Sequence, residues 1–235
     1  MGREVIILAG GLGTRLREVI GETSKPMAAV AGRPFLEHVL NYLGRFNFEH
    51  VILSVGYRWE SIQSHFGDSF QGIKISYAIE KQPLGTGGAI KFAMEKCKSD
   101  QVMVLNGDTF FEVNFNEFYN AHDDSSADVS LVLRKVNQPD RYGTVSLNES
   151  HKVLQFIEKR KGLVTGLING GVYLICRRAF ESFELPTRFS VEEEFFAIHL
   201  HSLRIQGFIS DGYFIDIGVP KDYAKANEKF RLLTD

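Results

Sequence analysis

The stretch that decides the fold is Val5-Ile6-Ile7-Leu8-Ala9-Gly10-Gly11-Leu12-Gly13-Thr14-Arg15-Leu16. Its five apolar residues predict a buried strand. The glycines after them predict a turn in which no side chain blocks a ligand from the backbone N–H groups. Arg15 adds a fixed positive charge, and Lys25-Pro26-Met27 adds a second one ten residues later. Strand, glycine turn and two cations together predict a site for a polyphosphate.

Two common phosphate-binding motifs do not fit this loop. Counted from Gly11, the dinucleotide-binding fingerprint needs Gly or Ala where Leu16 stands. The Walker A motif closes with Gly-Lys-Ser/Thr, whereas the nearest lysine, Lys25, is followed by proline. Plainer interpretations stay open, because glycine-rich turns are common after a first strand. Arg15 could pair with Glu18, and Lys25 could be an ordinary loop lysine.

The composition is that of an ordinary globular chain. The chain has 235 residues, 44% of them hydrophobic and 24% charged, enough for one large α/β domain. A net charge of -2 shows no excess of basic residues of the kind that binds nucleic acid or membrane surfaces, so neither partner is expected. Cys97 and Cys176 form no CxxC motif and are expected to be buried and reduced. No stretch resembles a signal peptide or a membrane span, so we expect a cytoplasmic protein.

The first half of the chain alternates strand and helix patterns. Strands are expected at 5–9, 50–55, 73–79 and 101–105, and helices at 35–43, 57–66 and 88–97. This alternation predicts a single-domain, Rossmann-like α/β fold over residues 1–235, with a mixed, mostly parallel sheet flanked by helices. Ligands are expected at the carboxyl ends of the strands.

The second half is richer in strands, expected at 128–134, 144–147, 153–156 and 171–175, with a strand pair within 208–217 and a last helix from Pro220. Ser190-Val191-Glu192-Glu193 predicts a capping box that opens a helix reaching about Leu200. Glu193 is therefore interpreted as a cap residue rather than a catalytic acid. His199 and His201 stand two residues apart in that helix and face different directions, so both are expected to be structural.

Two aspartates follow apolar strand patterns and have a glycine nearby. Asp108 lies in Asn106-Gly107-Asp108, and Asp216 lies in Asp216-Ile217-Gly218. Magnesium takes one or two carboxylates and completes its shell with phosphate oxygens and water, so the pair fits a Mg²⁺ site beside a phosphate loop. An aspartate next to glycine is also a common turn or cap residue, and that alternative stays open.

Seven motifs in order resemble the signature of the sugar-phosphate nucleotidyltransferases. They are LAGGLGTRLREVIGETSKPMAAVAGRPFLEHVL at 8–40, LGTGGA at 84–89, NGDTFF at 106–111, Tyr142-Gly143, Glu158-Lys159, NGGVY at 169–173 and IDIGVPKDY at 215–223. The resemblance implies the nucleotide-diphospho-sugar transferase fold, with a nucleotide-binding half at 1–110 and a sugar-binding half at 111–235. It also implies the reaction of an NTP with a sugar 1-phosphate to give an NDP-sugar and pyrophosphate, with Mg²⁺ as cofactor.

The resemblance also implies residue roles. Arg15 and Lys25 would be catalytic, and Asp108 and Asp216 would hold the metal. The nucleotide would be bound by Leu8, Gly10, Gly11, Gly13, Thr14, Glu80, Gln82, Gly87 and Asn106. The sugar phosphate would be bound by Tyr142, Gly143, Glu158, Lys159, Asn169 and Gly170. For several of these an ordinary turn, loop or solvated charge cluster is the alternative.

Within the family, the LREV…SKPM and VAGRPFLEHVL segments are most similar to enzymes that use GTP and D-glycero-D-manno-heptose 1-phosphate. The same chemistry on mannose 1-phosphate, or with UTP or dTTP and a hexose 1-phosphate, stays open. A nucleotide-sugar sensor without activity is a remote alternative, because such a protein is expected to lose Arg15, Lys25 or Asp108. The residues leave the oligomeric state open, a homo-oligomer included.

Overall fold

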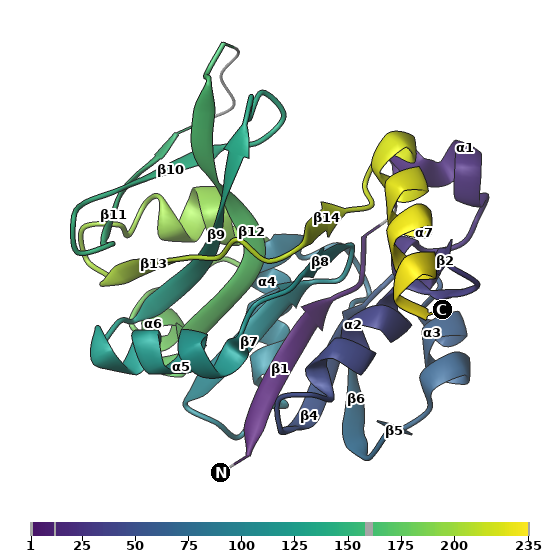
Figure 1. Ribbon diagram of the computed structural model, residues 1–235. Coiled ribbons are helices and arrows are strands. Elements are labelled where there is room, and N and C mark those ends of the chain that lie inside the picture. Colours follow the sequence, from purple (N-terminus) through teal and green to yellow (C-terminus); the bar gives the residue numbers. More distant parts are fainter. Residues whose placement is uncertain (1, 12, 158–161, 235) are drawn as a thin grey trace.

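The computed structural model describes residues 2–11, 13–157 and 162–234 (Figure 1). At its centre is one mixed ten-stranded sheet with the order β11-β10-β12-β7-β1-β4-β6-β5, to which β9 and β13 are joined through β12. The neighbours β7, β1, β4 and β6 are parallel. Strand β12 runs antiparallel to β7 and joins the second half of the chain to this parallel part.

The strands of the large sheet are β1 (Arg3–Leu8), β4 (Phe48–Val55), β5 (Ser69–Phe70), β6 (Ile73–Ile79), β7 (Gln101–Asn106), β9 (Val129–Asn137), β10 (Thr144–Leu147), β11 (Val153–Ile157), β12 (Thr165–Cys176) and β13 (Ile205–Ile209). Two small ribbons pair β2 (Ala29–Val30) with β3 (Arg33–Pro34), and β8 (Thr109–Phe111) with β14 (Phe214–Asp216). The helices are α1 (Arg17–Ile20), α2 (Phe35–Leu43), α3 (Trp59–Phe66), α4 (Gly85–Met94), α5 (Phe115–Asp124), α6 (Arg177–Glu181) and α7 (Pro220–Thr234). Shorter turns are the 3-10 turns η1 (Thr14–Leu16) and η2 (Lys25–Met27) and the π-helical turn η3 (Val191–Phe196).

Helices cover both faces of the sheet, which is why β1 is apolar from Val5 to Leu8. Val5 and Ile7 pack in the cluster that contains side chains of α2, α3, α5 and α7. Ile6 packs in the cluster that contains side chains of α4, α6 and η3. A strand buried on both faces has a continuous apolar pattern rather than an alternating one. The expected α/β fold with a mixed sheet flanked by helices is confirmed.

Several predicted boundaries are wrong for local backbone reasons. The helix expected from residue 57 begins at Trp59, because Arg58 is in the left-handed region at φ 54° and precedes the first turn. The helix expected at 88–97 is α4, which covers Gly85–Met94. The strands expected within 208–217 exist, but they do not pair with each other, since β13 pairs with β9 and β14 pairs with β8.

The predicted capping box is off by one residue. The Ser190 side chain accepts a hydrogen bond from the Glu193 backbone N–H, as expected. The return bond runs from the Ser190 N–H to Oε2 of Glu194, at 2.7 Å, and not to Glu193. The segment forms the π-helical turn η3 instead of a regular helix to Leu200, and its wider turn moves the reciprocal carboxylate one position along the chain.

The two cysteines and His199 have structural positions, whereas His201 is exposed. Cys97 and Cys176 are free and buried, as expected. The ring of His199 stacks on Phe183 with centroids 3.8 Å apart. Among the residues that the structure describes, no helix has the length and apolar character needed to cross a bilayer.

Candidate active site

The loops that follow β1 and β7 lie side by side at one edge of the sheet. Leu8 and Asn106 are register partners in the parallel pair of strands. Beyond them, the Gly107 N–H donates to the Leu8 carbonyl at 2.9 Å. The glycine turn and the Asn106-Gly107-Asp108 turn therefore begin at the same place, as the strand order requires.

Lys25 lies against the glycine turn and pairs with Asp108. Gly13 has φ +64°, and a Cβ built there would lie 2.8 Å from Cγ of Lys25. Only glycine leaves room for the lysine stem at this point. The Lys25 ammonium donates to Oδ2 of Asp108 at 2.9 Å, with the lysine side chain 11% exposed. Gly11 has open space around it instead, with nothing within 4 Å of a built Cβ.

The two predicted metal ligands are brought together by the β8–β14 ribbon. Thr109 pairs with Asp216, and the Ile217 N–H donates to the Asp108 carbonyl at 3.0 Å. Burial raises the pKa of Asp216, and the negative charge of Asp108 raises it further. The positive charges of Lys25 and Arg15 act on that pKa in the opposite direction.

Arg15 is thus within electrostatic reach of Asp216. Its side chain is exposed and makes no ion pair within the described part of the chain, so the alternative pairing with Glu18 is not seen. The nearby carboxylate of Glu22 pairs with Arg17 and Arg58 instead. The contact of Arg15 with a ligand at the glycine turn stays a prediction.

The carboxylates of Asp108 and Asp216 suit a divalent cation that also binds phosphate. Within residues 2–11, 13–157 and 162–234, no cluster of three or more His, Cys, Asp or Glu side chains is arranged to hold a metal. Magnesium does not need such a cluster, because it takes one or two carboxylates and completes its octahedron with phosphate oxygens and water. The β8–β14 register and the bond from the Ile217 N–H to the Asp108 carbonyl bring the two aspartates to the same place.

The residues predicted to read the base have different surroundings. The Glu80 carboxylate accepts from the Ser54 hydroxyl at 3.0 Å and from the Leu84 N–H at 3.1 Å. These bonds hold the segment between β6 and α4 beside Gly10, whose built Cβ would lie 3.0 Å from Glu80 Oε1. Gln82 is exposed in this segment.

Gly87 is a packing position. Its N–H donates to the Phe189 carbonyl at 2.9 Å, and a Cβ built on it would lie 2.1 Å from the Phe189 ring. The glycine therefore lets the first turn of α4 lie directly on the segment before η3. Its contact with a base stays a prediction.

The residues predicted to bind the acceptor meet those predicted to bind the nucleotide at a bulge in β12. The pairing of β12 with β9 is interrupted between Asn169 and Tyr173. In the bulge, Gly171 has φ +70°, and a Cβ there would lie 2.6 Å from Nδ2 of Asn106. A Cβ on Gly170 would meet the Phe111 ring at 2.5 Å. The glycines of NGGVY thus allow the bulge to touch the strand that leads to Asp108.

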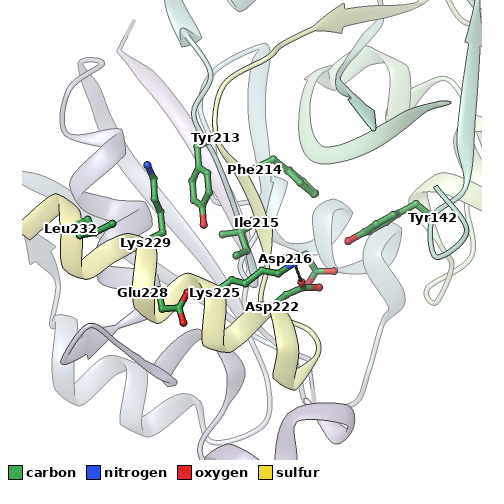
Figure 2. Close-up of a pocket in the computed structure, with 10 residues that line it drawn as sticks. All are labelled: Tyr142, Tyr213, Phe214, Ile215, Asp216, Asp222, Lys225, Glu228, Lys229 and Leu232. Carbon is green, nitrogen blue, oxygen red and sulfur yellow. Dashed lines mark hydrogen bonds and ion pairs between the residues drawn. The ribbon is translucent and has the colours of Figure 1, made fainter. Parts of the chain in front are cut away.

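A cavity of about 390 Å³ opens beside Asp216 (Figure 2). It is lined by Tyr142, Tyr213, Phe214, Ile215, Asp216, Asp222, Lys225, Glu228, Lys229 and Leu232. Figure 2 shows Tyr142 facing this space from the side opposite α7. Gly143 directly precedes β10, and a Cβ built on it would lie 3.2 Å from the carbonyl of Ile157 at the end of β11. Glu158, Lys159 and the side chain of Thr14 lie outside the described residues.

Comparison with known proteins fits this geometry. The family model described as "Nucleotidyl transferase" matches residues 4–231. The chain belongs to this nucleotidyl transferase family. Its likeness to known members extends over nearly the whole chain.

Two curated nucleotidyl transferases are similar over almost their full length. The D-glycero-alpha-D-manno-heptose 1-phosphate guanylyltransferase of Aneurinibacillus thermoaerophilus is 44% identical over 229 residues, which cover 97% of this chain and 98% of that protein. The enzyme of the same name from Campylobacter jejuni is 46% identical over 222 residues, covering 94% and 96%.

Solved structures give the same picture. HddC from Yersinia pseudotuberculosis complexed with GMP-PN superposes with a TM-score of 0.86 at 37% identity, covering 97% of this chain and 99% of that one. A putative glucose-1-phosphate thymidylyltransferase from Bacillus anthracis has a TM-score of 0.86 at 20% identity and covers 97% and 95%. At that identity it supports the fold alone.

Sequence reasoning on this nucleotidyl transferase missed four residues near the site. Arg141 donates to Asp222 Oδ2 at 2.7 Å, and Lys225 donates to Asp222 Oδ1 at 3.2 Å. The hints were the place of Arg141 before Tyr142-Gly143 and of Asp222 inside the last motif. Glu192, described below, was interpreted only as part of a helix cap.

Proposed function

We propose that this nucleotidyl transferase joins the guanylyl group of GTP to D-glycero-D-manno-heptose 1-phosphate, giving GDP-heptose and pyrophosphate. The observation that carries the chemistry is the Lys25–Asp108 ion pair, which lies against Gly13 with Asp216 beside it. The choice of guanine and heptose rests on the two full-length relatives at 44% and 46% identity and on the HddC structure with GMP-PN.

The physical difficulty of the reaction is charge repulsion. A phosphate oxygen of the sugar 1-phosphate attacks the α-phosphorus while the bond from that phosphorus to the α–β bridging oxygen breaks. The incoming group and the triphosphate are both anions, and two unit charges about 4 Å apart repel by about 4 kcal/mol at an effective dielectric constant near 20. Neutralising this charge and aligning the reactants is the main task of the site.

The chain offers matched groups for that task. Backbone N–H groups of the glycine turn would bind the triphosphate, and Arg15 would stabilise the charge that develops on the leaving pyrophosphate. Lys25, whose ammonium is bonded to Asp108, would lie between the α-phosphate and the acceptor phosphate. A magnesium ion held by Asp108 and Asp216 would supply further positive charge to the phosphate oxygens. The attacking oxygen is ionised, so no general base is required.

The acceptor would be bound on the side of Tyr142, Gly143, Asn169 and Gly170, with Glu158 and Lys159 as further predicted contacts. The base would be read by the segment that Glu80 holds, with Gln82 as its exposed amide. Because GTP is a cytosolic substrate, the proposed reaction belongs in the cytoplasm. Its product would be an activated donor for glycosyl transfer, as in the building of capsule or lipopolysaccharide.

The decisive experiment is a substrate matrix. Each of the four ribonucleoside triphosphates and dTTP is combined with D-glycero-D-manno-heptose 1-phosphate, mannose 1-phosphate and glucose 1-phosphate, with magnesium present, and pyrophosphate release is measured. We expect the highest kcat/KM with GTP and the heptose phosphate. Faster release with UTP or dTTP would overturn the guanylyl assignment, and faster release with mannose 1-phosphate would overturn the heptose assignment.

A further inference from the structure

The Glu192 carboxylate gathers hydroxyl groups from three separate segments. Its Oε1 accepts from the Tyr173 hydroxyl at 2.8 Å. Its Oε2 accepts from the Thr86 hydroxyl at 3.0 Å and from the Ser190 hydroxyl at 3.2 Å. Thr86 belongs to the first turn of α4, and Tyr173 belongs to β12. One side chain of η3 therefore connects α4 to the strand that contains the bulge at Asn169–Tyr173.

The network continues from Tyr173 to a predicted acceptor-binding residue. The Asn169 Nδ2 donates to the Tyr173 hydroxyl at 2.8 Å, and its Oδ1 accepts from the Gly171 N–H at 3.0 Å. Both ends of the amide are therefore held by the protein. The second N–H of Nδ2 makes no hydrogen bond to the described part of the chain and can serve a ligand oxygen.

The direction of these hydrogen bonds follows from chemistry. A carboxylate only accepts, whereas a phenol has a single proton to donate. Since Tyr173 donates its proton to Glu192, it can only accept from Asn169, and this fixes which end of the amide faces the phenol. Tyr173 is fully buried, so no water competes for its hydroxyl.

We propose that Glu192 is a positioning residue that fixes the orientation of the Asn169 amide through Tyr173, with Thr86 anchoring the carboxylate on α4. The inference rests on the proposed function only in taking Asn169 as a group that binds the acceptor sugar. In the fixed orientation Asn169 offers an N–H to a sugar hydroxyl oxygen. If the amide flipped, it would offer a carbonyl oxygen instead and would lose the bond from Gly171.

The test is Glu192→Gln, which keeps the shape of the side chain. The glutamine carbonyl oxygen keeps both hydrogen bonds from the Thr86 and Ser190 hydroxyls only when the amide NH2 faces Tyr173, and the proton of Tyr173 is then free to point at Asn169. We expect the KM for the acceptor sugar 1-phosphate to rise about 10-fold, while the KM for GTP stays within about twofold of the wild-type value. Tyr173→Phe should raise the acceptor KM by a similar factor, and the double variant should be no worse than the poorer single one, since both act through the same hydrogen-bond chain.

The matched control is Glu193→Gln, which makes the same change of charge one residue away on an exposed side chain. It should leave both KM values unchanged. Calorimetric titration of each variant with the acceptor alone, without nucleotide, gives a second readout that does not depend on turnover. Thermal unfolding of each variant separates a change of affinity from a loss of folding.

The outcomes distinguish the inference from the function. If Glu192→Gln folds and binds the acceptor as tightly as Glu193→Gln does, the positioning role is wrong and the proposed function stands. If Glu192→Gln raises the KM for GTP and for the acceptor equally, the role is merely structural and the inference is again wrong. If the wild-type protein neither binds nor converts any sugar 1-phosphate, the proposed function fails, and the inference fails with it.

Discussion

At the scale of single residues, the site depends on one lysine whose charge and stem have separate contacts. The stem of Lys25 packs on Gly13, and its ammonium pairs with Asp108 at 2.9 Å. The partner Asp108 side chain is 32% exposed, so water can solvate it when the ammonium is absent. The charge is therefore expected to matter for catalysis far more than for folding.

Lys25→Met tests this separation, since methionine keeps a long apolar stem against Gly13 and removes the charge. We expect a melting temperature close to that of the wild type and a kcat lower by at least about 100-fold, because the charge that stabilises the transferring phosphate is lost. Lys74→Met, on the exposed face of β6, is the control and should keep full turnover. A folded Lys25→Met enzyme with near-normal kcat would contradict the role assigned to the lysine.

That Lys25, Asp108 and Asp216 lie together at one end of the sheet was predictable from the sequence, whereas the contacts of the neighbouring side chains were not. The chain order of apolar run, glycine turn, Arg15 and Lys25 places charge at a strand end by topology alone. Glu80 looked equally available to a ligand, but its carboxylate is bonded to Ser54 and Leu84. A carboxylate in a loop has the same pattern whether it meets a ligand or the backbone, so only coordinates separate the two.

At the scale of elements, the central strands β1 and β7 were predictable because burial on both faces gives a continuous apolar run, and β6 was predictable because its pattern alternates. The ends of helices were not, because they depend on single backbone angles such as φ 54° at Arg58. The π-helical turn η3 was also missed, since the Ser190 capping pattern matches an α-helix and a π-turn until the return bond to Glu194 is seen. The partners of β13 and β14 depend on contacts far apart in the chain, which periodicity does not record.

The close docking of α4 on the segment before η3 makes a prediction of its own. Gly87→Ala should lower the free energy of unfolding by about 1–3 kcal/mol, because the new methyl group would lie 2.1 Å from the Phe189 ring. Gly44→Ala, at the end of α2, is the matched control, since its Cβ would make only contacts of 3.4 Å or longer. The measurement is chemical denaturation of both variants. Equal stability of Gly87→Ala and wild type would mean that this glycine is kept for a ligand rather than for packing.

At the scale of the whole molecule, the two ends of β1 differ in the groups that surround them. Its carboxyl end opens into the glycine turn and the charged site. Near its amino end, the buried carboxylate of Glu4 accepts from the N–H groups of Lys98 and Ser99 at 2.5 and 2.6 Å and contacts Nδ1 of His50 at 2.9 Å. This carboxylate connects β1 to β4 and to the segment before β7. A buried charge therefore holds three segments together at the end of the sheet remote from the site.

The hydrogen bonds of Glu4 should make the stability of the fold depend on pH in the acidic range. Burial pushes the pKa of Glu4 upward, but the hydrogen bonds from His50, Ser99 and Lys98 outweigh it and hold the pKa below its ordinary value of 4.5. A group whose pKa is lower in the folded state stabilises the fold above the unfolded-state pKa, and this contribution is lost as the pH falls through the folded-state pKa.

Glu4→Gln is expected to unfold about 2 kcal/mol more easily at pH 7, because the backbone donors lose a charged acceptor. The gap between variant and wild type should shrink steadily below about pH 4.5. Denaturant titrations from pH 7 to pH 3 measure it, with kcat/KM at pH 7 followed in parallel and expected to be unchanged. A gap that is constant with pH would show that Glu4 acts through its shape alone, and a fall in kcat/KM in the folded variant would show that the two ends of β1 are coupled.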